Sequence, residues 1–168
     1  MKFQPKFLSF ALALAIGWLA GTSAMNAAEK TPSAPEANKQ LIRESFDRWR
    51  AGTGGPFELL AEDATWTITG NSVVAKKYAT REEFLSTVIR PFNARVTKPL
   101  VPTVRSLHCD GDTVIALFDG EATARDGKPY RNTYAWFMEI KDGKIVTVTA
   151  FFDAIVFDEF WKRVAPKE

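Results

Sequence analysis

Carboxylate side chains are the residues of this chain best suited to move a proton. Asp153 ends the stretch RNTYAWFMEIKDGKIVTVTAFFD, and Asp119 and Glu121 lie two residues apart in an earlier run of apolar residues. If these side chains faced an apolar interior, desolvation would raise their pKa values and suit them to acid–base work. We therefore expect Asp153 and Glu121 to be catalytic candidates and Asp119 to contact a ligand.

Each carboxylate also has an ordinary structural interpretation. If Gly120 reverses the local alternation, Asp119 and Glu121 would both face solvent, and Glu121 could pair with Arg131 on the neighbouring strand. Asp153 could instead cap the short helix that FDEFWKRV predicts, because an Asp oxygen accepts hydrogen bonds from the first N–H groups of a helix. The sequence leaves these alternatives open.

Metal and cofactor chemistry have little support in the sequence. His108 is the single His and Cys109 the single Cys, so neither a metal-ligand cluster nor a supported Ser-His-Asp arrangement is present. One Cys cannot form an intrachain disulfide. No glycine-rich phosphate loop or dinucleotide motif occurs. We expect no metal and no cofactor, and a fold held together by its aromatic core.

One strand face offers a second set of candidates. Side chains alternate along a strand, so every second residue of the 130–140 stretch shares a face. An apolar wall with a few polar groups is the usual form of a small-molecule site. The expected ligand-binding residues are Asn132, Tyr134, Trp136 and Met138 on that face, with Trp66 and Ile68 from an earlier strand. The alternative is that Trp136 and Met138 are simply core residues.

Helices precede most of the predicted strands. From Asn38, apolar residues recur at helical spacing until AGTGG ends the pattern, and Pro56 can start a short second helix. ATWTIT (64–69) alternates as a strand does. Residues 80–89 predict another helix, since Thr80 and Glu83 have the spacing of a capping box. Pro91 should kink or end that helix.

The remaining residues predict sheet. Asp-Gly pairs at 110–111, 126–127 and 142–143 are separated by equal intervals and flanked by branched and aromatic runs. Asp-Gly suits tight hairpin turns, so the pattern predicts a four-stranded antiparallel meander. Gly120 is a candidate for a bulge or bend. We predict an α+β fold in which a strongly bent antiparallel sheet wraps around the N-terminal helices as a cone.

At this level of detail the chain resembles a known superfamily. ELLAEDATWTITG and YRNTYAWFMEIKDGKIVTVTAFFD resemble the nuclear transport factor 2-like superfamily, in its SnoaL-like and ketosteroid-isomerase-like branch, from about Asn38 to Arg163. The resemblance implies the cone fold. It also implies a small apolar ligand, or cofactor-free isomerisation, cyclisation or dehydration. A non-catalytic binding module and a dimerising scaffold are the alternatives, because this fold hosts many functions.

The functional residues of that branch carry over poorly. The place of the ketosteroid-isomerase general base holds Ile68, and the place of its protonated oxyanion Asp holds Trp136. The Arg-x-Asp pair of limonene-epoxide-hydrolase-like members corresponds to Tyr134 and Trp136. Only Asp153 matches, as the terminal Asp of the last strand and the acid–base Asp of SnoaL-like cyclases. The resemblance therefore implies one proton-moving residue, Asp153.

Residues 1–24 predict a secretory signal peptide. Lys2 and Lys6 precede an uncharged apolar run from Phe7 to Ala20, and small residues follow up to Ala24. We expect cleavage there, a disordered spacer over 25–37, a domain over 38–168, and a secreted or periplasmic location without a stable membrane anchor. The processed chain would carry equal numbers of acidic and basic residues, which does not favour a nucleic-acid partner.

The 130–140 stretch also predicts self-association. Ala135 and Phe137 give its second face apolar residues as well, beside the face predicted to form the pocket. A sheet with two apolar faces needs a second cover, and a twofold copy is the commonest one. We expect a homodimer.

Overall fold

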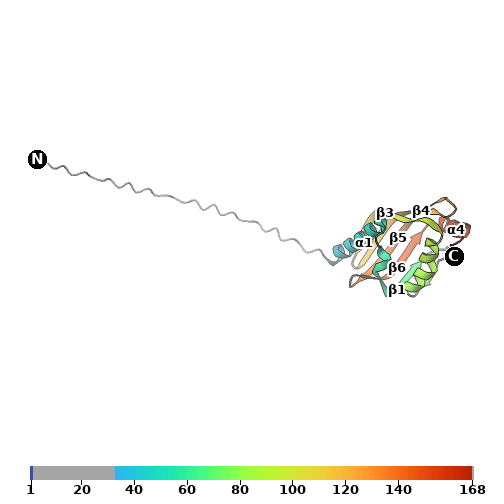
Figure 1. The fold of residues 1–168 in the computed structure, drawn as a ribbon. Coiled ribbons are helices and arrows are strands. Elements are labelled where there is room, and N and C mark those ends of the chain that lie inside the picture. Colours follow the sequence, from blue (N-terminus) through green and yellow to red (C-terminus); the bar gives the residue numbers. More distant parts are fainter. Residues whose placement is uncertain (2–32, 168) are drawn as a thin grey trace. The chain divides into compact units, whose positions relative to one another are not determined.

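The computed structural model describes Met1 and residues 33–167 (Figure 1). The first element is helix α1 (Ala34–Ala51). It begins before Asn38, so the last residues of the predicted spacer are helical. Its end is as predicted, because Gly52 adopts a left-handed φ of 71° that glycine tolerates without strain. The predicted signal peptide and the first part of the spacer lie outside the described residues.

The second helical segment runs past Pro91. It consists of α2 (Arg81–Phe84), the π-helical turn η2 (Leu85–Ile89) and α3 (Arg90–Asn93). The predicted cap is confirmed, since Thr80 Oγ1 accepts a hydrogen bond from the Glu83 N–H at 3.1 Å. The Arg90 N–H bonds to the Leu85 carbonyl five residues back. This wider turn accommodates the proline ring that would otherwise break the helix.

The predicted meander is confirmed as part of a larger sheet. Its strands are β3 (Val96–Asp110), β4 (Thr113–Ala124), β5 (Pro129–Lys141) and β6 (Lys144–Phe152), each antiparallel to the next. The 3₁₀ turn η1 (Pro56–Leu59) leads into β1 (Leu60–Ile68), which pairs with β6 in parallel and with β2 (Lys77–Tyr78) antiparallel. The order is β2-β1-β6-β5-β4-β3, so the sheet is mixed rather than wholly antiparallel.

Edge strand β3 is longer than its sequence suggests. It contains Pro99 and Pro102, which lack the N–H group of a ladder and are tolerated at a sheet edge. Its pairing with β4 shifts register three times, whereas β4 pairs with β5 without interruption. The irregularities expected at Gly120 therefore lie on β3. Gly120 is needed for space, because a Cβ there would lie 3.0 Å from side-chain atoms of Leu100 and Tyr134.

The helices cover one face of the sheet, which we call the inner face (Figure 1). Phe46 of α1 packs edge-on against Phe118 of β4 with ring centroids 4.9 Å apart, and Phe84 of α2 stacks on Trp66 of β1 at 4.0 Å. Helix α4 (Ala154–Arg163) places Phe160 against Tyr130 at the start of β5. Among the described residues, no helix has the length and apolar character needed to cross a membrane.

Candidate ligand pocket

A pocket of about 390 Å³ opens between the inner face of the sheet and the helices. We call it the inner pocket. Its floor is formed by Tyr134 and Trp136 of β5, and its mouth includes the exposed residues Asn93, Thr97 and Pro99. The remaining lining residues are Trp49 of α1, Phe57 of η1, Ile89 and Phe92 of the second helical segment, and Val96 and Leu100 of β3. The lining contains no charged residue.

The alternation of side chains along β5 directs the two residues of the pocket floor toward the inner face. Residues 130, 132, 134, 136, 138 and 140 of β5 are all buried, while the residues between them are exposed or half-buried. Trp136 stacks on Trp49 of α1 with ring centroids 5.8 Å apart and meets Phe118 edge-on at 4.8 Å. Tyr134 stacks on Phe118 at 4.9 Å. These aromatic contacts hold both floor residues in place.

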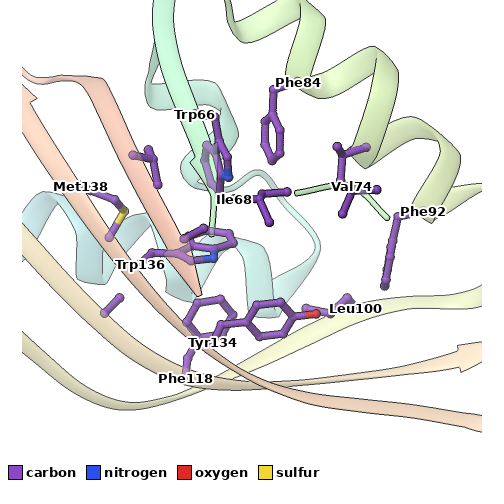
Figure 2. Close-up of a cluster of buried hydrophobic side chains, with 14 of the residues drawn as sticks. Trp66, Ile68, Val74, Phe84, Phe92, Leu100, Phe118, Tyr134, Trp136 and Met138 are labelled. Atoms are coloured by element: carbon purple, nitrogen blue, oxygen red, sulfur yellow. The ribbon is translucent and has the colours of Figure 1, made fainter. Parts of the chain in front are cut away.

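A chain of hydrogen bonds ends at the pocket floor. The Asn132 amide donates to the Tyr130 hydroxyl at 3.1 Å, and the hydroxyls of Tyr130 and Tyr134 are 2.7 Å apart. Because the amide nitrogen can only donate, the Tyr130 oxygen accepts from it. Tyr130 can then donate its own proton to Tyr134. With Tyr130 as the donor of this bond, the Tyr134 proton is available to an oxygen atom in the pocket, and Figure 2 shows the Tyr134 hydroxyl pointing toward Leu100.

Burial keeps both phenols protonated. Desolvation raises the pKa of Tyr130 to about 12, although the hydrogen bonds with Tyr134 and Asn132 oppose the shift. Desolvation, followed by the interaction with Tyr130, raises the pKa of Tyr134 well above its ordinary value. A phenol in this state donates a hydrogen bond but does not act as a base near neutral pH.

Asn132 supports the phenols and does not face a ligand. Its amide oxygen accepts from the Asp153 N–H at 2.9 Å, and its nitrogen also donates to the Asp153 carbonyl at 3.0 Å. Both amide protons and the amide oxygen are therefore used. The position of Asn132 does not support the expected role in holding a ligand. It supports a role in orienting Tyr130.

Asp153 caps the N-terminus of helix α4, which was its structural alternative. One carboxylate oxygen accepts hydrogen bonds from the Ile155 and Val156 N–H groups at 2.9 and 3.2 Å, and the side chain is exposed. These bonds satisfy two free donors at the start of α4. The expected placement of Asp153 in the aromatic cavity is wrong, because the strand ends here and the chain turns into α4.

Asp119 and Glu121 face away from the pocket. The unbroken β4–β5 pairing places Phe118 and Gly120 inward, so the expected inward placement of both carboxylates is wrong. Glu121 pairs with Arg131 at 3.1 Å, as the alternative proposed. Asp119 accepts from Thr133 at 2.7 Å and from Arg105 at 2.6 Å. The Thr133 hydroxyl and then Arg105 lower the pKa of Asp119, opposite to the expected direction.

These carboxylates share a polar depression on the other side of the sheet, which we call the outer hollow. Its lining residues are Arg105, Asp119, Gly120, Glu121, Arg131, Asn132, Thr133, Asp153 and Val156. The carboxylates there are paired with arginines, a hydroxyl or helix N–H groups. The structure thus brings the three predicted carboxylates together, but outside the inner pocket.

The other predicted residues face inward as expected. Trp66 and Ile68 line a small void of about 50 Å³, which Tyr134 and Trp136 separate from the inner pocket. Figure 2 shows Trp66 and Trp136 side by side, and their rings meet edge-on at 4.9 Å. Met138 is fully buried and lines neither the inner pocket nor this void, so its core alternative fits its position.

Several lining residues were not among the predicted site residues. Ile89 lies within the helix predicted over 80–89, but nothing in the sequence shows that a π turn brings it to the pocket. Leu100 lies between two prolines that conceal the strand. Phe57 could have been suspected from Pro56, which marks the short helix that carries it.

The profile of the SnoaL-like domain family matches residues 42–148, more than half of the chain. The chain belongs to this family. The match includes the pocket floor and most of the helical lining, and it confirms the resemblance drawn from the sequence. A comparison with curated proteins finds no match.

Solved structures confirm the nuclear transport factor 2-like fold. Bal32a, from a soil-derived mobile gene cassette, is 23% identical with a TM-score of 0.63, and the match covers 77% of this chain and 99% of that one. A nuclear transport factor 2-like protein of Burkholderia thailandensis is 22% identical with a TM-score of 0.61, over 73% and 95%. A protein of Jannaschia named for a proposed SnoaL-like polyketide cyclase is 14% identical with a TM-score of 0.60, over 78% and 95%. At these identities the likeness concerns the fold alone.

Proposed function

We propose that this SnoaL-like domain binds a small, largely apolar molecule that carries a carbonyl or hydroxyl oxygen. The observation that carries the proposal is the end of the Asn132–Tyr130–Tyr134 chain at the floor of an apolar pocket. Apolar walls supply most of the binding free energy, and the Tyr134 hydroxyl fixes the orientation of one oxygen. The pocket volume of about 390 Å³ is in the range of small-molecule sites.

Binding fits the site better than acid–base catalysis. Proton abstraction needs a base within hydrogen-bond reach of the substrate. No carboxylate or His lines the inner pocket among the described residues. The phenols hold their protons too firmly to act as bases. An isomerase, cyclase or dehydratase would have to recruit Asp153 or Glu121 from the outer hollow.

Ketone probes test the proposal. Biphenyl and para-acetylbiphenyl share an apolar frame and differ by one carbonyl group. Titration followed by tryptophan fluorescence should show tighter binding of the ketone, because Trp49 and Trp136 line the pocket. Tyr134→Phe should lower the affinity for the ketone about tenfold, which corresponds to the loss of one neutral hydrogen bond. The affinity for biphenyl should not change. Thr133→Ala, on the outer face of the same strand, is the control.

If neither probe bound, or if Tyr134→Phe left the preference for the ketone intact, the proposed function would be wrong. Turnover of a ketone that depended on Asp153 or Glu121 would instead support the enzymatic alternative. Both variants can be checked for folding by circular dichroism.

We also propose that the domain forms a homodimer through the outer face. Phe137 and Phe151 are 38% and 46% exposed and pack edge-on with ring centroids 5.9 Å apart. The nearby Arg105–Asp119 and Arg131–Glu121 pairs carry both signs of charge, so a twofold copy would meet no net repulsion. Light scattering should show a dimer that Phe137→Asp converts to monomer, whereas Glu139→Gln on the same face does not. A monomer at micromolar concentration would contradict this.

Export is the third proposal. It rests on the sequence of residues 1–24, with its two lysines, uncharged run and small residues before Ala24. The domain would then act in the periplasm or outside the cell. Intact-mass measurement of exported protein should show a chain that begins at or shortly after Met25. A mature chain that retained Phe7 would overturn the proposal.

A further inference from the structure

One buried donor in the core has no hydrogen-bond partner. The indole N–H of Trp66 contacts no acceptor among the described residues, and the side chain is only 4% exposed. A buried donor without a partner loses its hydration without compensation. Most buried polar groups in folded proteins are paired, so an exception often marks a place where another molecule binds.

The side chain that carries this donor borders an empty space. Trp66 lines the void of about 50 Å³ together with Ile68, Phe84 and Val88, and with residues of β5, β6 and α4. Figure 2 shows the indole nitrogen on the side of the ring that is turned toward Ile68 and Phe84. Stacking on Phe84, with the rings 9° from parallel, fixes the ring and therefore the direction of the N–H group.

Water is a poor occupant of this void. A buried water is stable when it makes two to four hydrogen bonds. The void is lined almost wholly by apolar side chains. A water beside Trp66 would therefore receive one hydrogen bond from the indole and find few further partners.

The void and the inner pocket share a wall. Tyr134 and Trp136 line both spaces, so a displacement of the Trp136 ring from its contacts with Trp49 and Phe118 would join them. An apolar ligand on the pocket floor could then extend past Trp136 toward β1. Its far end would meet the unpaired N–H group of Trp66.

We propose that the void at Trp66 is the deep end of the ligand site and that the Trp66 indole donates to a second acceptor oxygen of the ligand. This inference rests on the proposed function and narrows it. The ligand carries two acceptors separated by an apolar frame, one for Tyr134 and one for Trp66. No carboxylate lines either space among the described residues, so a charged ligand group would find no counter-charge there.

The matched variants are Trp66→Phe and Trp49→Phe. Trp66→Phe keeps an aromatic ring against Phe84 and removes the buried donor together with part of the ring volume, so it should fold with reduced stability. Trp49→Phe removes an indole from the outer part of the inner pocket and serves as the control. The probes are biphenyl, para-acetylbiphenyl and para,para′-diacetylbiphenyl, which carry no, one and two acceptor oxygens.

The diketone should bind tighter than the monoketone in the parent protein. Trp66→Phe should abolish this gap of about fivefold to tenfold. Trp49→Phe should preserve the gap. The proton NMR resonance of the Trp66 indole N–H, assigned by its loss in Trp66→Phe, should move downfield only with the diketone.

Three outcomes would overturn the inference. If the monoketone binds through Tyr134 but the gap survives Trp66→Phe, the second acceptor lies elsewhere and the proposed function still stands. If the Trp66 indole proton exchanges rapidly with solvent and is already shifted downfield without ligand, water occupies the void. If no probe binds, the inference and the proposed function fail together.

Discussion

The two faces of β4 and β5 carry opposite chemistry on the same backbone. Inward residues such as Phe118 and Tyr134 form an apolar floor with one phenol pair, whereas outward residues such as Asp119 and Thr133 form hydrogen bonds and ion pairs at the surface. Adjacent residues thus experience different environments. The carboxylates considered for proton transfer lie on the outer side, bonded to arginines, a hydroxyl or helix N–H groups, and the inner pocket contains neutral donors instead.

The environment of a side chain decides its chemical role more than its residue type does. Asp119 would suit acid–base work in an apolar cavity, but a hydroxyl and a guanidinium lower its pKa on the outer face. A tyrosine in water has an ordinary phenol pKa. Burial raises the pKa of Tyr134, so its hydroxyl stays protonated and can donate a hydrogen bond. Each variant below either weakens or sharpens the contrast between the two faces.

Removing an aromatic ring should show the largest contrast. Trp136→Ala deletes a side chain packed between Trp49, Phe118 and Trp66 and should lower the free energy of unfolding by about 3–5 kcal/mol. Phe137→Ala, one residue along on the outer face, should cost about 1 kcal/mol or less. Urea denaturation of dilute protein measures both. Equal losses would mean that the two faces are not buried differently.

The second-largest effect is expected at alkaline pH, which should destabilise the fold through the buried tyrosines of the inner face. Folded Tyr130 holds its proton up to about pH 12, whereas an unfolded tyrosine loses it near pH 10. The raised pKa of Tyr130 therefore contributes fully to the free energy of unfolding below pH 10. This contribution, about 3 kcal/mol, is lost as the pH rises through 12. Tyr134, whose pKa burial also raises, adds to the loss in the same direction.

Ultraviolet absorbance of tyrosinate and urea denaturation between pH 9 and about 12 can follow this effect. Tyr134→Phe should flatten the dependence of stability on pH. An unchanged stability up to pH 12 in the parent protein would show that the phenols are hydrated rather than buried.

Adding a methyl group at Gly120 should have an intermediate effect. The new Cβ would lie 3.0 Å from Leu100 and from the Tyr134 ring, closer than ordinary contact. We expect Gly120→Ala to cost about 2 kcal/mol and to weaken ketone binding by displacing Tyr134. Asp119→Ala, the outward neighbour, removes an exposed ion pair and should cost less than about 1 kcal/mol without affecting binding. A Gly120→Ala variant with parental stability and affinity would contradict the close packing under Tyr134.

The smallest effect is expected at the helix cap. Asp153→Ala removes the acceptor for two N–H groups of α4 and should cost about 1 kcal/mol, whereas Asp153→Asn should cost only a few tenths. Thermal denaturation near neutral pH can resolve the difference. If Asp153→Asn abolished turnover of any substrate while stability was unchanged, Asp153 would be catalytic despite its position.

The sequence predicts alternation along single elements well. Every second residue from Tyr130 to Ile140 is buried, because a strand has period two and aromatic residues mark its inner face. The three Asp-Gly turns locate the meander correctly. Only Asp142 and Gly143 both adopt positive φ, at 50° and 71°, so the turn positions were more predictable than their geometry.

Relations between elements were less predictable. The face of Asp119 depends on the length of the turn between β4 and β5, which sets the register, and the sequence alone does not fix that length. The pocket mouth depends on a proline-containing edge strand and on a π turn, neither of which has a strong sequence pattern. The Tyr130–Tyr134 hydrogen bond joins residues four apart on one strand, a contact that alternation allows but does not require.

The central claim is that Tyr134 donates a hydrogen bond to a ligand oxygen inside the inner pocket. The most direct measurement is the carbonyl carbon NMR resonance of isotope-labelled para-acetylbiphenyl bound to the parent protein and to Tyr134→Phe. A donated hydrogen bond withdraws electron density from the carbonyl carbon, so the resonance should move downfield in the parent protein and much less in the variant. Equal carbonyl shifts in the two proteins would show that the ketone binds without Tyr134 and would contradict the account.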